Sequence, residues 1–335
     1  MWWYILRRLF TLFLVLVGMS VITFTISHVI PIDPAAAAAG MEASPEVIER
    51  IRKEWGLDQP LHVQYFRYIG DILLRGDFGY SILNRRPVLD DILRFAPASL
   101  ELALFSLAIC VPMGIILGAV TATRAGGLVD ALVRIFAIVG VAMPIFWLAL
   151  LLQLVFYWKL DWFPDGARLG IEYLSPPAVT RLFLIDSLLA GQLDVFRDAL
   201  WHLVLPGVTL ALANIAIITR MTRSSLMEVM HQDYIRTARS KGLTAISVLG
   251  RHAMKNAMVP VVTVIGLQLG YLIAWVFLVE YIFSWPGIGS YAVRCIVNLD
   301  FPAVQGVTLF TSFVFVFINL AVDLIYLFLD PRITY

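Results

Sequence analysis

A polar stretch in the second half of the chain reads Arg220-Met-Thr-Arg-Ser-Ser-Leu-Met-Glu-Val-Met-His-Gln-Asp-Tyr-Ile-Arg-Thr-Ala-Arg-Ser-Lys-Gly242 and continues to Lys255. Long apolar runs flank it on both sides. It holds seven Lys and Arg residues against two acidic residues, an excess of five positive charges. Loops between membrane spans that carry such an excess face the cytoplasm. The stretch therefore predicts a membrane protein and the side on which this loop lies.

The composition agrees with a bilayer environment. The chain has 335 residues, of which 60% are hydrophobic and 15% charged, whereas soluble domains carry about 25% charged residues. Six apolar runs approach or exceed the roughly 20 residues that cross a bilayer. The six predicted spans are Leu9–Val29, Ser99–Thr121, Leu132–Trp158, His202–Thr219, Ala257–Tyr281 and Val304–Leu329. The first run is longer than the 7–15 apolar residues of a signal peptide, which predicts an uncleaved anchor.

The remaining charges predict the orientation. Arg7 and Arg8 precede the first span, Arg124 lies between the second and third, and Arg332 follows the last. With both termini in the cytoplasm, all of these segments lie on the same side as the basic loop. The two opposite segments, 31–97 and 159–200, each carry a net charge of −2. The total charge of +1 and the two cysteines indicate neither nucleic-acid binding nor a zinc site or disulfide framework.

We divide the chain into residues 1–30, an N-terminus and first anchor; 31–97, an extracytoplasmic helical segment; and 98–335, a five-span core with a cytoplasmic loop at 220–256. Within 31–97, Ser44-Pro45-Glu46 is typical of a helix start, and Gly56 of its end. A second amphipathic helix is expected over 63–74, followed by a turn at 76–81. This segment is either a lid that packs on the spans or a surface for a partner protein.

The basic loop itself contains a predicted short helix. Asp233 is expected to cap a helix over Tyr234–Lys241, and Gly242 to end it. Eight residues extend for about 12 Å, too short to cross a membrane. Ala238 and Gly242 are four residues apart and predict a small, close-approach face. Two interpretations remain open at this point, a helix that docks in a groove of another protein and a solvated loop that only sets topology.

Two runs of this loop carry a family resemblance. They are Asp233-Tyr-Ile-Arg-Thr-Ala-Arg-Ser-Lys-Gly-Leu243 and His252-Ala-Met-Lys-Asn-Ala-Met-Val-Pro260. They resemble the cytoplasmic signature loop of binding-protein-dependent ABC importer permeases, and in particular the dipeptide, oligopeptide and nickel branch. Further matches are Gly76-Asp-Phe-Gly79, Met143-Pro-Ile-Phe-Trp147, Arg220-Met-Thr-Arg-Ser-Ser225, Phe283-Ser-Trp-Pro-Gly-Ile-Gly289 and Asp330-Pro-Arg332. The resemblance therefore covers nearly the whole chain.

The sequence departs from the family pattern at a few positions. The general signature begins Glu-Ala-Ala, whereas this chain has Arg236-Thr-Ala238, and Val259-Pro260 lies further from Gly242 than usual. Both departures are typical of the peptide branch. Near the first span that branch often has Pro-Gly-Asp-Pro, whereas this chain has Pro31-Ile-Asp-Pro34, which affects a local turn.

The resemblance implies an all-α membrane protein with six transmembrane helices and the type I ABC importer permease fold. It implies a bacterial cytoplasmic (inner) membrane location and partners: a second homologous permease, two ATP-binding subunits and an extracytoplasmic substrate-binding protein. The short helix would then be the coupling helix that rests in a groove of an ATPase. The residues that would couple are Tyr234, Ile235, Arg236, Thr237, Ala238, Arg239, Lys241 and Gly242.

The lysines give independent support for a separate ATPase. A phosphate-binding P-loop needs Gly-Lys-Ser/Thr. The residues before the four lysines, at 53, 159, 241 and 255, are Arg, Trp, Ser and Met. The chain therefore contains no such motif, and ATP and Mg²⁺ are expected in a partner rather than bound by this chain.

Polar residues inside the predicted spans are candidates for a pathway or gate, because a charge at mid-span costs about 2.5–3.5 kcal/mol. These candidates are Glu280, Gln268, Asn319 and Asp323. Glu280 is expected at the outer end of its span, within reach of water or a salt bridge. Asn319 and Asp323 share one helical face, and Asp323 is expected to pair with a cation such as Arg220. For Gln268, a hydrogen bond between helices is the alternative.

These observations predict a permease subunit of an ATP-driven importer for peptides or peptide-like solutes, moved by alternating access without covalent chemistry. Glutathione, opines and nickel complexes are alternative cargoes within the family. An ion-coupled secondary transporter is the alternative outside it, although we find no internal repeat of the kind common in that class. Five scattered histidines provide no grouping for an intramembrane enzyme.

Overall fold

A computed structural model describes residues 2–29, 34–40 and 43–329. The described residues form two compact units. The first comprises residues 1–97 and 286–317, and the second comprises residues 98–285 and 318–335. Two long helices, α5 (Val88–Thr123) and α14 (Phe301–Leu329), each contribute residues to both units.

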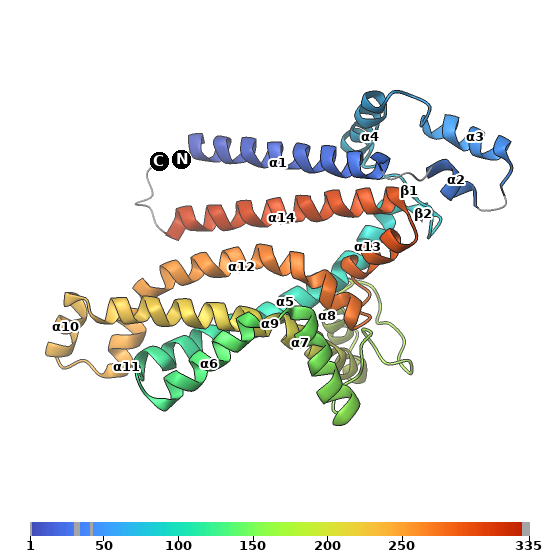
Figure 1. Ribbon diagram of the computed structural model, residues 1–335. Coiled ribbons are helices and arrows are strands. Elements are labelled where there is room, and N and C mark those ends of the chain that lie inside the picture. Colours follow the sequence, from blue (N-terminus) through green and yellow to red (C-terminus); the bar gives the residue numbers. More distant parts are fainter. Residues whose placement is uncertain (1, 30–33, 41–42, 330–335) are drawn as a thin grey trace. The chain divides into compact units, whose positions relative to one another are not determined.

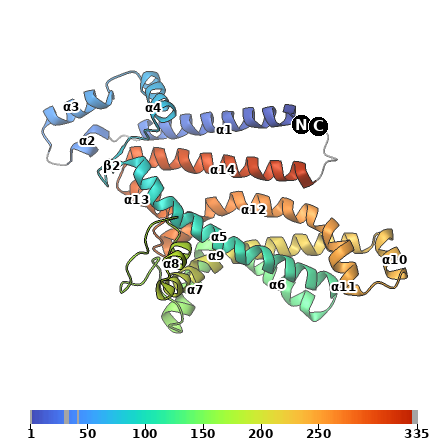
Figure 2. The same ribbon diagram turned by 180° about the vertical axis from the view of Figure 1, so that it is seen from behind.

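The first unit contains one long apolar helix and several shorter elements. Its helices are α1 (Trp2–Val29), α2 (Pro34–Ala39), α3 (Pro45–Trp55), α4 (Leu61–Arg75) and α13 (Ile288–Val297). α1 and the first part of α14 run side by side (Figures 1 and 2), and the Gln305 amide donates to the Ser27 hydroxyl between them. The predicted helix from Pro45 to Gly56 is confirmed, with Gly56 at φ 69°. The second predicted helix is confirmed by α4.

A small hairpin follows α4 where a turn was predicted. Its strands β1 (Tyr80–Ser81) and β2 (Arg86–Pro87) pair antiparallel, with Ser81 opposite Arg86. The Asp300 carboxylate holds the hairpin by accepting from the Ser81 hydroxyl at 2.5 Å and the Leu83 N–H at 3.0 Å. Asp91 accepts from Asn84 at 2.7 Å and from the Tyr291 hydroxyl at 2.8 Å. These buried carboxylates link the hairpin to α5, α13 and the start of α14.

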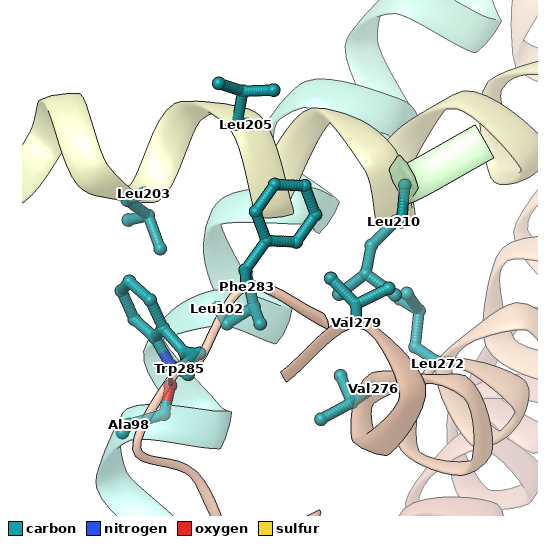
Figure 3. Packing of buried hydrophobic residues seen from close by; sticks show 11 residues of the cluster. Ala98, Leu102, Leu203, Leu205, Leu210, Leu272, Val276, Val279, Phe283 and Trp285 are labelled. Atoms are coloured by element: carbon teal, nitrogen blue, oxygen red, sulfur yellow. Dashed lines mark hydrogen bonds between the residues drawn. The ribbon is translucent and has the colours of Figure 1, made fainter. Parts of the chain in front are cut away.

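The second unit is arranged around α9 (Leu193–Met230), which is buried along much of its length. The remaining helices of this unit are α6 (Leu128–Ala142), α7 (Ile145–Leu152), α8 (Phe183–Leu189), α10 (Asp233–Ser240), α11 (Ala245–Ser247) and α12 (Met254–Ile282), with π-helical segments η1 (Gln153–Lys159) and η2 (Val248–Ala253). α6, α7, α8 and α12 all contact α9. A hydrophobic core around Trp285 joins α5, α9 and α12, and Figure 3 shows its indole beside Ala98, whose carbonyl accepts the indole N–H at 2.9 Å.

Glycines allow α5 to approach α9 closely. A Cβ atom added to Gly114 would lie 2.6 Å from the Ile218 Cβ, and one added to Gly118 would lie 2.5 Å from the Thr222 Cβ. The two glycines form a Gly-xxx-Gly pattern, which typically marks close helix contacts in membranes. This contact was not predicted from the sequence.

The prediction of one continuous third span over 132–158 is wrong. α6 ends at Ala142, α7 begins at Ile145, and the two are bent by 109°. Pro144 lacks a backbone N–H and disfavours helical geometry at Met143, which is extended at φ −79° and ψ 127°. Five helices of the described residues are long and apolar enough to span a membrane, and the bent pair makes a sixth if it counts as one span.

All of the spanning helices begin earlier than predicted, and the difference is largest for α5 and α9. α5 begins at Val88 and α9 at Leu193, ahead of the expected starts at Ser99 and His202. The first turn of each helix contains acidic residues, Asp90 and Asp91 in α5 and Asp194 in α9. Their negative charges interact favourably with the positive end of the helix dipole. The helices therefore continue beyond their apolar runs. α8 and α13 were not predicted.

Candidate coupling surface and buried polar groups

The short helix of the basic loop exists as α10, with small differences from its prediction. It begins at Asp233 rather than Tyr234, and its N-cap residue is Gln232, so the prediction that Asp233 caps it is wrong. Asp233 instead lies 3.5 Å from Arg236 in an exposed ion pair. Gly242 follows with φ 77°, and its N–H donates to the Arg239 carbonyl at 2.9 Å. The predicted glycine termination is thus confirmed, because glycine adopts this conformation without strain.

One face of α10 packs against its own chain. Ile235 is fully buried and Ala238 is 6% exposed. Both belong to a core cluster with Leu226, Val248, Ala253 and Ala257, from α9, η2 and α12. The prediction that Ala238 offers a small docking face is therefore wrong, because its methyl group fills a contact within this chain. Through this packing α10 contacts α9, η2 and α12.

The opposite face of α10 is exposed and basic. Figures 1 and 2 show α10 at the end of α9, beyond the other helices of its unit. Its exposed predicted coupling residues are Tyr234, Arg236, Thr237, Arg239, Lys241 and Gly242. The Tyr234 hydroxyl accepts from the Asn256 amide at 2.7 Å, which ties this face to α12. The structure thus brings the predicted surface together, without Ile235 and Ala238.

Glu280 does not reach water. It is fully buried and accepts a hydrogen bond from the Ser99 hydroxyl at 2.5 Å. The chain after α12 folds back here, since the Trp285 N–H donates to the Glu280 carbonyl at 2.8 Å. The predicted position of Glu280 near the end of its helix agrees with the structure, but the predicted access to water is wrong, because the side chain is fully buried. Glu280 thus links α12 to α5 inside the second unit.

The other candidate polar residues lie in half-buried positions. Gln268 is on α12, and Asn319 and Asp323 lie one turn apart on the part of α14 that belongs to the second unit. Gly266 contacts Val322 closely, so α12 and α14 meet at this level. In the described residues no ion pair joins Asp323 to Arg220, which instead lines a cavity beside α6. The pathway role of these residues stays a prediction.

Sequence reasoning missed a buried ion pair in the second unit, between α5 and the loop that precedes α8. The Arg168 guanidinium donates to the Glu101 carboxylate at 2.6 and 2.9 Å and to the Arg181 carbonyl at 2.8 Å. It also lies 3.7 Å from the centre of the Phe183 ring. Burial lowers the pKa of Arg168 from its ordinary value, and the Glu101 carboxylate opposes that shift. The sequence signal that could have revealed this ion pair is Glu101, a carboxylate at the start of an apolar run.

A second carboxylate organises the same loop. Asp186 on α8 accepts hydrogen bonds from the backbone of Val179, Thr180 and Arg181, and from the Thr180 hydroxyl at 2.7 Å. Burial alone would raise the pKa of Asp186, but these hydrogen bonds outweigh it and hold the pKa below its ordinary value. Asp186 therefore remains ionised near neutral pH and keeps the loop folded onto α8.

Comparison with known families gives matches along most of the chain. Residues 114–335 match the family described as binding-protein-dependent transport system inner membrane component. Residues 1–103 match the N-terminal region of membrane components of the same systems. The two matches together leave only a short interval within α5.

Similar proteins match over almost their full length. The chain is 47% identical to the probable D,D-dipeptide transport system permease protein DdpB of Escherichia coli over 333 residues, 99% of this chain and 97% of that protein. It is 42% identical to the dipeptide transport system permease protein DppB of Alkalihalophilus pseudofirmus, covering 99% of each chain. It is 39% identical to DppB of Escherichia coli, covering 98% of each.

Proposed function

This chain belongs to the inner membrane components of binding-protein-dependent transport systems, and we propose that it is a permease subunit of an ATP-driven importer for peptides or peptide-like solutes. The family has the type I ABC importer permease fold, in agreement with the apolar helices described above. The names of the three relatives, all dipeptide permeases, support the peptide class. The family match decides against the ion-coupled alternative.

The proposed partners follow from this assignment. A substrate-binding protein would deliver the peptide from outside, two ATP-binding subunits would supply ATP hydrolysis, and a second related permease would complete the pathway. This chain contains no Gly-Lys-Ser/Thr sequence for phosphate binding, which supports a separate ATPase. We place both termini and α10 in the cytoplasm because the basic segments share that side.

The coupling proposal rests on the difference between the two faces of α10, one packed and one exposed. Its apolar face, with Ile235 and Ala238, is locked against α9, η2 and α12. Its opposite face presents Arg236, Arg239 and Tyr234. A helix that is rigid on one side and exposed on the other passes a push from a bound ATPase directly to the spanning helices. Alternating access would then move the peptide without any covalent step.

The test is charge reversal on the exposed face, Arg236→Glu with Arg239→Glu, in the complete importer. Both side chains are exposed, so we expect insertion and thermal stability to be unchanged. Dipeptide uptake in proteoliposomes and peptide-stimulated ATP hydrolysis should fall by more than about tenfold, because like charges across an interface cost several kcal/mol. Arg197→Glu, at an exposed position of α9 to which no role is assigned, is the control for charge reversal.

Normal assembly and uptake in the double variant would show that α10 is not the coupling element. Uptake that continues without ATP or binding protein would overturn the wider assignment. Ala238→Glu is unsuitable for this test, because it places a carboxylate in the buried contact between α10 and α9, η2 and α12. The substitution would therefore disturb folding as well as docking.

A further inference from the structure

A cavity of about 570 Å³ lies between α6 and α9 in the second unit, next to the end of α5. Its size falls within the range of small-molecule sites. The two helices run antiparallel along it, because Arg223 of α9 binds Asp130 near the start of α6, whereas Ala216 lies beside Gly140 near the end of α6. The end with the arginines is the end of α9 that leads to α10.

The arginines give this end a surplus of positive charge. Arg223 directs two nitrogens to the buried Asp130, at 2.8 and 3.0 Å, and is neutralised there. Arg134 approaches Asp130 less closely, at 3.6 Å, and its side chain is 56% exposed. Arg220 is exposed and forms no ion pair with any residue that the structure describes. Three arginines therefore face one carboxylate, which favours an anionic ligand.

A buried hydroxyl in the cavity wall also lacks a partner. Thr219 is 3% exposed, lines the cavity and directs its Oγ1 to no hydrogen-bond partner among the described residues. A buried hydroxyl without a partner is unfavourable, and native structures generally satisfy such groups. A ligand oxygen beside Thr219 and Arg220 would satisfy this hydroxyl and the free cation together.

The rest of the cavity is apolar and open along α6. Val133, Ala137, Ile138 and Val141 line it at intervals of one, three and four residues, on one side of the helix. Ile138 is 68% exposed and Val141 is 47% exposed. The ligand must therefore join an anionic group at one end to a long apolar part that lies along a membrane helix.

We propose that this cavity binds one anionic phospholipid. Its phosphate oxygens lie between Arg134, Arg220 and the Thr219 hydroxyl, and an acyl chain follows the apolar face of α6. Basic pockets between transmembrane helices on the cytoplasmic side are suited to such headgroups. A short peptide would satisfy the cations but would leave the apolar face of α6 uncovered.

The test uses the full chain in mild detergent and native mass spectrometry, with phosphatidylglycerol and phosphatidylcholine of equal acyl chains as probes. We expect phosphatidylglycerol to bind more tightly than phosphatidylcholine. Arg220→Gln should weaken phosphatidylglycerol binding roughly fivefold, as expected for one cation near an anionic headgroup. Arg251→Gln, an exposed arginine on η2 that does not line the cavity, should leave it unchanged.

Thr219→Val separates binding from folding. The substitution keeps the shape of the side chain and removes a hydroxyl that has no partner in the described structure. We expect weaker phosphatidylglycerol binding with a thermal midpoint that is unchanged or raised. Equal binding of the two lipids, or unchanged phosphatidylglycerol binding in both variants, overturns the proposal.

A second permease is the competing occupant. Cys110 and Cys295 are both buried, so a cysteine introduced by Ile138→Cys would be the accessible thiol. We expect it to react with a lipid-soluble maleimide in the complete importer. Efficient cross-linking of this position to the second permease would show that protein, rather than lipid, covers the cavity, and would overturn the proposal.

Discussion

At the scale of single residues, the ion pair between Glu101 and Arg168 is the sharpest test of the second unit. Their side chains are 5% and 8% exposed. We expect Glu101→Gln to lower the free energy of unfolding by about 3–5 kcal/mol, because it leaves the Arg168 charge buried without its partner. Thermal and denaturant unfolding of the purified chain measure the loss. Glu172→Gln, in an exposed part of the same loop, is the control.

The apolar double variant completes this test. Replacing both partners, with Glu101→Leu and Arg168→Met, should recover much of the loss, because paired apolar residues avoid the desolvation of an isolated charge. A single variant that is as stable as the original protein would mean that the pair contributes only local order to the loop.

Sequence reasoning was correct for residues whose role depends on backbone conformation. It was wrong for residues whose role depends on whether other parts of the chain bury them. Gly242 was correctly predicted to end α10, since a left-handed conformation favours glycine. Ala238 and Glu280 were expected at surfaces, yet both are buried. Helical spacing shows that residues share a face, but it does not show whether the chain itself covers that face.

At the scale of elements, the spanning helices were predictable because twenty apolar residues have few alternatives to a membrane helix. The exception is the region of α6 and α7, where an apolar run concealed a bend of 109°. Hydropathy measures how apolar a segment is and is insensitive to backbone geometry. Pro144 carried the missing signal, because proline ends or kinks a helix at the residue before it.

The close contact between α5 and α9 depends on a glycine at position 118. Gly118→Ala should destabilise the chain by about 1–3 kcal/mol, because overpacking a close contact forces the helices apart. Gly140→Ala is a matched control, since its Cβ would meet Ala216 at an ordinary 3.6 Å. That change should be neutral or stabilising, because alanine favours a helix more than glycine does. Equal effects in thermal unfolding would contradict the close packing of α5 on α9.

At the scale of the whole molecule, charge predicts what packing cannot, namely which loops share a side of the membrane. The basic loop containing α10 and the acidic segment 159–200 are expected on opposite sides. This orientation is a prediction about the protein in the cell. The orientation of this loop also determines whether the exposed face of α10 can contact a cytoplasmic ATPase.

Cysteine labelling measures this orientation. Ser240 and Leu174 are exposed, and the native Cys110 and Cys295 are buried, so Ser240→Cys and Leu174→Cys introduce distinct reactive thiols. We expect an impermeant maleimide to label Leu174→Cys in intact spheroplasts and Ser240→Cys only after the membrane is opened. Labelling of Ser240→Cys should fall again when the ATPase subunits are present, because they cover α10. The reverse pattern of labelling would place α10 outside and remove the physical basis for coupling through it.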